Sequence, residues 1–175
     1  GLDTVGQEVI EEIQADVATL KADVDAVKAE VDREFSHRSY IFPDMASDID
    51  LTCTFTSGAI DEFGAWAEIT DSGATTLSSI AAVHALHISA LRIRTTSRAD
   101  KLYVIEIGYG LAADAVTILD PHGFGSGTKK IDSDEQVRFR PPVIPQGQKV
   151  YYRMKTEDIL NATATVELRY HYHPV

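Results

Sequence analysis

Histidine is the residue type in this 175-residue sequence whose spacing comes nearest to that of a metal site. In His171-Tyr172-His173 both imidazoles fall on one face of a strand, because side chains alternate between the two faces. Neutral imidazole is a common ligand of transition-metal ions. His84 and His87, three residues apart, share a face only if that segment is helical, and the sequence identifies no further ligands for either pair. We therefore predict no bound metal and interpret His171 and His173 as part of an exposed polar strand edge. These two residues are nevertheless the candidate ligands if the chain does bind a metal ion.

Two other segments resemble ligand-binding loops in composition. The glycine-rich segment 123–127 follows a predicted strand, but it lacks the Gly-Lys-Ser/Thr ending of a phosphate-binding loop. The acidic cluster 132–135 lacks the glycine and the terminal glutamate of a calcium-binding loop. The sequence also contains no Gly-x-Ser-x-Gly elbow and no spacing that singles out a catalytic triad, so we expect no enzyme activity and no cofactor. The predicted polar loop 120–135 instead offers candidate contacts to an external ligand: Phe124, Lys129 and Lys130.

The composition excludes several classes of partner. The net charge is −11 at pH 7, so the chain offers no basic footprint for nucleic acid. Residues 1–35 hold 10 acidic and 3 basic side chains, which places most of the negative charge there. No apolar run approaches the roughly 18 residues of a membrane-spanning helix, so no membrane insertion is expected. The single cysteine, Cys53, excludes an intrachain disulfide, and its place in an alternating strand pattern indicates a small core residue.

The most regular pattern lies near the N-terminus, where apolar residues recur at alternating steps of three and four. Such a heptad repeat, with apolar residues at positions a and d, is typical of a coiled coil between separate chains. Positions b, c and f carry no large apolar residue, whereas a helix packed on its own domain usually has a wider apolar stripe. We therefore predict a coiled-coil stalk over residues 1–35. Its trimerisation seam consists of Ile10, Ile13, Val17, Leu20, Val24, Val27 and Val31.

The charged residues beside the seam predict how the helices associate. Asp16 and Asp23 occupy g positions and Lys21 and Lys28 occupy e positions, so parallel chains form interchain salt bridges between them. An antiparallel arrangement tends to set like charges against each other. β-Branched residues at both a and d favour three helices, and neither Asn nor Lys interrupts the seam. We predict a parallel homotrimer, with a dimer, a tetramer and a helix folded on its own domain as open alternatives.

The rest of the chain has the two-residue period of β-strands. The clearest strands are expected over 48–56, 102–109 and 163–172, a further strand over 75–80, and either helix or strand over 81–87. Eight or nine short strands, without helices between successive strands, predict a mainly β fold, specifically an antiparallel, jelly-roll-like β-sandwich. The expected domains are a coiled-coil stalk over 1–35, a neck over 36–47 and a β-sandwich head over 48–175.

A heptad stalk followed by an all-β head resembles the trimeric attachment and decoration proteins of viruses, such as the fibres and receptor-binding proteins of phages. The passage Arg140 to Met154, in which Pro145-Gln146-Gly147 precedes a strand, is similar to passages of phage structural heads. The resemblance implies a virion structural protein on the particle surface. Its partners would be other virion proteins and a glycan or protein on the host surface. Two alternatives stay open: a capsid decoration or head-fibre protein that binds the particle through its β domain, and a secreted cellular trimer with a tumour-necrosis-factor-like head.

Overall fold

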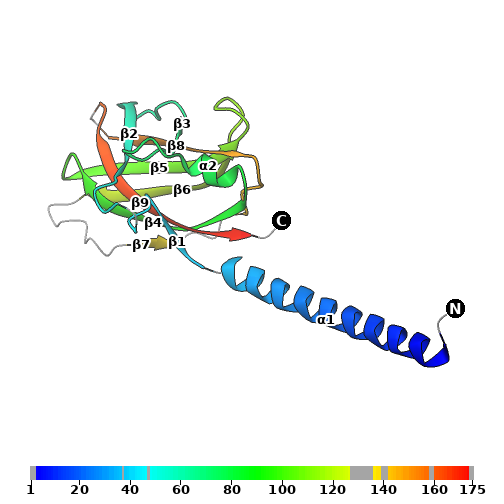
Figure 1. The fold of residues 1–175 in the computed structure, drawn as a ribbon. Helices are drawn as coiled ribbons and strands as arrows, with labels where there is room; N and C mark the ends of the chain where they lie inside the picture. Colours follow the sequence, from blue (N-terminus) through cyan, green and yellow to red (C-terminus); the bar gives the residue numbers. More distant parts are fainter. Residues whose placement is uncertain are drawn as a thin grey trace. The chain divides into compact units, whose positions relative to one another are not determined.

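The computed structural model describes residues 3–36, 38–46, 48–126, 136–138, 142–157 and 160–173, of which 33–36, 120–126, 136–138 and 173 are described by their backbone alone. The chain divides into two compact units, Gly1–His37 and Arg38–Val175. The first is a helical unit and the second is a β unit (Figure 1). The mainly β fold predicted from the sequence is confirmed at this level.

The helical unit consists of α1, Thr4–Ser36, a helix of 33 residues. Asp3 caps its first turn, because Oδ1 of Asp3 accepts a hydrogen bond from the backbone N–H of Gly6 at 2.8 Å. After Gly6 the helix contains neither glycine nor proline and is rich in alanine and glutamate, both strong helix formers. The helix therefore spans the whole heptad pattern, and local propensity agrees with the longer-range repeat.

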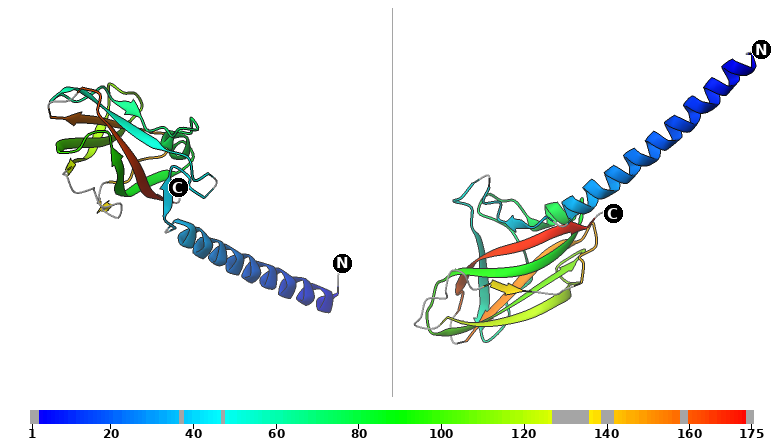
Figure 2. Two further views of the ribbon diagram at one scale, coloured as in Figure 1. Left: turned by 90° about the vertical axis from the view of Figure 1, so that its left-hand side faces the viewer. Right: turned by 90° about the horizontal axis from the view of Figure 1, so that it is seen from below.

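The β unit contains nine strands and a short helix among its described residues. In chain order they are β1 Tyr40–Phe42, β2 Cys53–Ile60, β3 Ala67–Glu68, α2 Leu77–Ala81, β4 Ala85–Thr96, β5 Lys101–Gly110, β6 Thr117–Ser126, β7 Gln136–Arg138, β8 Lys149–Thr156 and β9 Thr163–His173. Hydrogen bonds join the strands in the order β6-β5-β8-β2-β9-β4-β7, with β1 beside β9 and β3 beside β8. Figure 2 shows β9 in red beside β4 in green, the pair with the longest register.

Strand β2 connects two arms of this sheet. Arm A consists of β9, β4, β7 and β1, and arm B consists of β8, β5, β6 and β3. Residues Cys53 to Thr56 of β2 pair antiparallel with β9, whereas Ser57 and Ile60 pair parallel with β8. Because β8 and β9 run in opposite directions and β2 lies between them, β2 has to be parallel to one of the two. The prediction of an antiparallel sheet is therefore wrong at this pair, although the other strand pairs are antiparallel.

Gly58 lies where β2 changes partner. A Cβ atom at this position would lie 2.7 Å from the Cα of Gly64, closer than real Cβ atoms approach a backbone atom. We expect Gly58→Ala to lower the free energy of unfolding by about 1–3 kcal/mol, since the backbone would have to move to relieve the contact. Gly73→Ala is the matched control, because its Cβ would meet side-chain atoms and no backbone: Cδ2 of Leu51 at 3.0 Å and Oδ1 of Asp71 at 3.3 Å. Denaturant titration of both variants checks this, and equal losses would contradict the close crossing.

The two arms share one hydrophobic core. The apolar core side chains alternate along the strands: Val166 and Leu168 in β9 of arm A, and Tyr103 and Ile105 in β5 of arm B. The two-residue period predicted for these two strands is confirmed. Strand β1 adds to the core: Phe42 is buried there. Residues 38–46 of the predicted neck belong to the β unit by their contacts.

Residues 75–80, predicted as a strand, instead lead into helix α2. Thr76 caps this helix, because the backbone N–H of Ser79 donates to Oγ1 of Thr76 at 3.0 Å. Leu77 and Ala81 are four residues apart and both are buried, so one face of α2 packs against the core. A single helical turn contains too few apolar residues for a period to be read from the sequence.

The polar loop predicted over 120–135 is wrong for its first part. The backbone of β6 continues to Ser126, which lies opposite Lys101 of β5. Among the described strands β6 stands at the end of the sheet order, and such an edge position tolerates Pro121 and the following glycines because one side needs no hydrogen-bond partner. Residues 127–135 lie outside the described residues.

Candidate functional site

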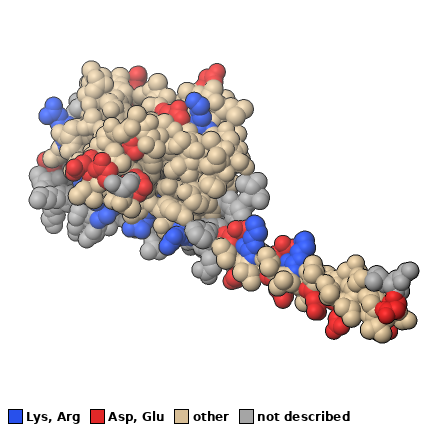
Figure 3. Space-filling model, in the orientation of Figure 1, with Lys and Arg blue, Asp and Glu red and all other residues tan. Residues whose placement is uncertain are grey.

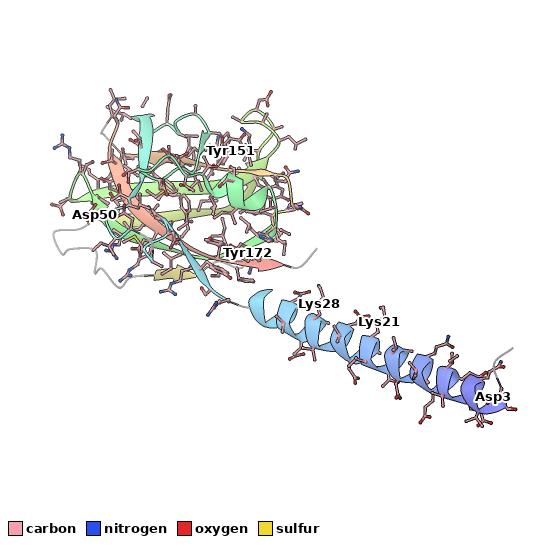
Figure 4. The ribbon with its side chains drawn as sticks, viewed as in Figure 1. Asp3, Lys21, Lys28, Asp50, Tyr151 and Tyr172 are labelled. Atoms are coloured by element: carbon pink, nitrogen blue, oxygen red, sulfur yellow. The ribbon has the colours of Figure 1, made fainter. Side chains whose placement is uncertain are left out.

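The predicted seam forms an exposed apolar row along α1. In the single chain the exposed fractions of its seven residues run from 39% for Ile10 to 64% for Leu20 and Val27. Figure 4 shows the side chains that project from α1 and labels Lys21 and Lys28 among them. Because the seven residues occupy consecutive a and d positions, one partner helix could cover all of them at once. The row is therefore a candidate self-association surface.

Charged residues flank this row. The ammonium group of Lys21 lies 2.8 Å from the carboxylate of Asp25, and that of Lys28 lies 2.7 Å from Asp32. The hydrogen bond to Asp32 raises the pKa of Lys28. All four side chains are at least half exposed, so water screens both pairs and they contribute little to stability. Figure 3 shows basic side chains in blue among acidic ones in red along α1. The predicted interchain salt bridges use the same two lysines and stay a prediction.

The predicted ligand contacts fall largely outside what the structure describes. The backbone of Phe124 lies in β6, opposite Tyr103 of β5, and its side chain is outside the description. Lys129 and Lys130 lie outside the described residues. These three candidates therefore stay predictions.

The histidines meet in a way the sequence does not indicate. His171 of β9 lies opposite His87 of β4, and Nδ1 of His87 is 3.2 Å from Nε2 of His171. The ring of His84 instead stacks near Tyr172, which Figure 4 labels, with 4.3 Å between ring centroids. The backbone of His173 lies opposite Ala85. Within the described residues no three His, Cys, Asp or Glu side chains gather as metal ligands.

The outer face of arm A carries an ion-pair cluster that sequence reasoning missed. The carboxylate of Glu167 in β9 lies 2.9 Å from the guanidinium of Arg94 and 3.4 Å from that of Arg92, both in β4. The Glu167 side chain is only 10% exposed, so the two arginines shield it from water. The cluster ties β4 to β9. Glu167 lies 73 and 75 positions from the two arginines, a separation that no sequence period connects.

A second missed cluster lies on arm B. The guanidinium of Arg153 in β8 lies 2.5 Å from Glu106 in β5 and 4.6 Å from the ring centroids of both Phe63 and Trp66. Trp and Arg are the residue types most enriched where proteins bind their partners. Trp66 is the only tryptophan of the chain, which is the one signal in the sequence that pointed here. We call these four residues the Arg153 cluster.

Cys53 is a core residue, as predicted, with 0% of its surface exposed. Burial raises the pKa of its thiol to about 12, and the nearby Asp71 carboxylate adds to the shift. The folded state therefore holds the thiol proton more tightly than the unfolded state, and this contribution to stability fades as the pH rises from the unfolded value towards about 12.

We expect Cys53 in the native chain to resist Ellman's reagent at about pH 8, because the reactive thiolate is both scarce and shielded. The same chain in denaturant should react at once. Following the absorbance of the released thiol measures both rates. Rapid labelling of the native chain would contradict the buried position.

No family model, curated protein or solved structure matches this chain. None of the described helices is both long and apolar enough to span a membrane.

Proposed function

We propose that this chain is a virion structural protein: a parallel homotrimer in which a coiled-coil stalk carries three β heads that attach to a host surface. The observation that carries the proposal is the exposed heptad row of α1.

A helix with the exposure of α1 requires a partner. Isolated helices gain little stability from propensity alone, and most helical stability in proteins comes from packing an apolar face. Leu20 and Val27 are each 64% exposed in the single chain. Covering a residue of this size contributes roughly 1.5–3 kcal/mol when burial is complete. Summed over the seven seam residues, this burial is the largest gain in free energy available to the helical unit.

The charge pattern favours a second copy of the same helix as that partner. In parallel register, Asp16 of one chain faces Lys21 of the next, and Asp23 faces Lys28, so the sequence complements itself. β-Branched residues at a and d favour three strands over two. A trimer is therefore proposed, and the two lysines would exchange their present partners in the same helix for partners on a neighbouring chain.

A trimeric stalk with three heads suits attachment, since three weak sites on one assembly gain affinity from their effective concentration. For the β unit we propose a jelly-roll-like sandwich, which the shared core of arms A and B supports. Within each head the Arg153 cluster is a candidate contact with a host glycan or protein, because it combines aromatic and guanidinium groups. The virion assignment itself rests on the resemblance of this architecture to viral fibres and attachment proteins.

Immunogold electron microscopy of virus particles from the source of this chain tests the function. An antibody raised against the full chain should label fibres or tail appendages. Labelling spread over the capsid shell would favour the decoration protein instead. Particles without any label, together with labelled secreted material of cellular origin, would contradict the virion assignment and favour the cellular trimer.

A further inference from the structure

The pairing of β4 with β9 brings two imidazoles together on one face of arm A. The register sets His87 directly opposite His171, and Nδ1 of the first lies 3.2 Å from Nε2 of the second. The two ring centroids are 4.7 Å apart and the rings meet edge to face at 79°. Both residues are partly buried. The backbones of two neighbouring strands therefore fix the positions of both histidines, and neither position depends on a loop.

The distance between the two nitrogens is close to that between two ligands of one metal ion. Two Zn–N bonds of 2.0–2.1 Å at a tetrahedral angle place the nitrogens about 3.3–3.4 Å apart. Both nitrogens carry a lone pair in the tautomers that place each ring proton on the other nitrogen, Nε2 of His87 and Nδ1 of His171. The final torsion of a histidine side chain has a broad energy profile, so a small ring rotation can then turn both lone pairs towards a shared ion. We propose that His87 and His171 form a two-histidine chelate for a borderline transition-metal ion such as zinc.

The residues around the two histidines determine how strongly and how selectively the pair would bind a metal ion. The pair supplies two of the four ligands of a tetrahedral zinc site, and within the described residues no third His, Cys, Asp or Glu gathers with it. Arg169 lies two residues from His171 on the same face of β9, and its positive charge weakens the binding of any cation. Imidazole suits zinc, nickel and copper, whereas magnesium demands oxygen ligands, so the pair discriminates between these classes.

A different reading of the same contact is a simple N–H to N hydrogen bond between two neutral rings. The two readings differ in their response to metal. In the chelate both nitrogens bind the metal ion, which then holds β4 and β9 together more firmly. A hydrogen bond alone predicts that added metal does not bind to the pair. The proposal is independent of the oligomeric state and of any role in attachment, because both histidines belong to one chain.

Isothermal titration of the full chain with zinc chloride tests the proposal. One zinc ion per chain is expected for the native sequence, with binding abolished in His87→Gln and in His171→Gln. His84→Gln is the matched control, since it removes a histidine at the same end of β4 whose ring lies against Tyr172, and it should bind zinc as the native chain does. Magnesium chloride should give no saturable heat.

A second measurement needs no variant that might fail to fold. Nickel added below one equivalent should broaden the backbone amide signals around His87 and His171 in an NMR spectrum of the native chain, because the bound ion is paramagnetic. Absence of saturable zinc binding by the native chain overturns the proposal. Zinc binding that persists in both glutamine variants, or nickel broadening centred elsewhere, does so as well.

Discussion

Replacing Leu20 with aspartate should dissociate the proposed trimer into single chains. Leu20 occupies a d position near the middle of the seam, where a parallel trimer would bring three copies of the side chain together. Three carboxylates in that position would be buried without partners, and burying one such charge alone costs several kcal/mol. The expected mass falls from three chains of 19.2 kDa, about 58 kDa, to that of one chain. Light scattering after size exclusion measures it.

Ala22→Asp provides the matched control, because Ala22 lies at an f position on the opposite side of the helix. It introduces the same residue with the same helix propensity two positions along the chain. The trimer should survive this change. The helix signal in circular dichroism should fall in Leu20→Asp and persist in Ala22→Asp. Identical behaviour of the two variants would mean that the seam is not the surface that holds the chains together.

The second large effect is expected in the β unit, from Phe55→Ala. Phe55 is fully buried in β2, and its ring stacks on that of Tyr152 in β8 with 3.8 Å between centroids and 8° between planes. The contact lies where β2 joins the two arms, so the cavity would open in the middle of the core. We expect a loss of about 3–5 kcal/mol in the free energy of unfolding.

Trp66 fluorescence in a denaturant titration reports this loss selectively, because the single tryptophan belongs to the β unit. Ile60→Ala is the control in the same strand: its side chain is 55% exposed, and the cost should stay below about 1 kcal/mol. A loss in Phe55→Ala no larger than that of the control would show that the stacked pair does not support the core.

Periodic features could be predicted from the sequence because they depend on neighbouring residues. The heptad of α1 and the alternation along β5 and β9 follow from the spacing of apolar side chains within one element. The burial of Cys53 follows from the same alternation in β2. Here the pattern and the structure depend on the same physical requirement, namely that one face of an element avoids water.

Features that depend on which strands become neighbours could not be predicted. The insertion of β2 between β8 and β9, with its one parallel pair, leaves no trace in the spacing of residues. The pairing of His87 with His171, rather than of His171 with His173, likewise depends on the register between β4 and β9. The two histidines lie 84 positions apart, so their contact leaves no local pattern in the sequence.

The mass of the intact chain in solution tests the central claim most directly. Light scattering on the full-length protein, over a range of concentrations, should give about 58 kDa for three chains of 19.2 kDa each. A mass of about 19 kDa at all concentrations would contradict the account. The exposed row from Ile10 to Val31 would then have no partner in a second copy, and a stalk that presents three heads could not exist.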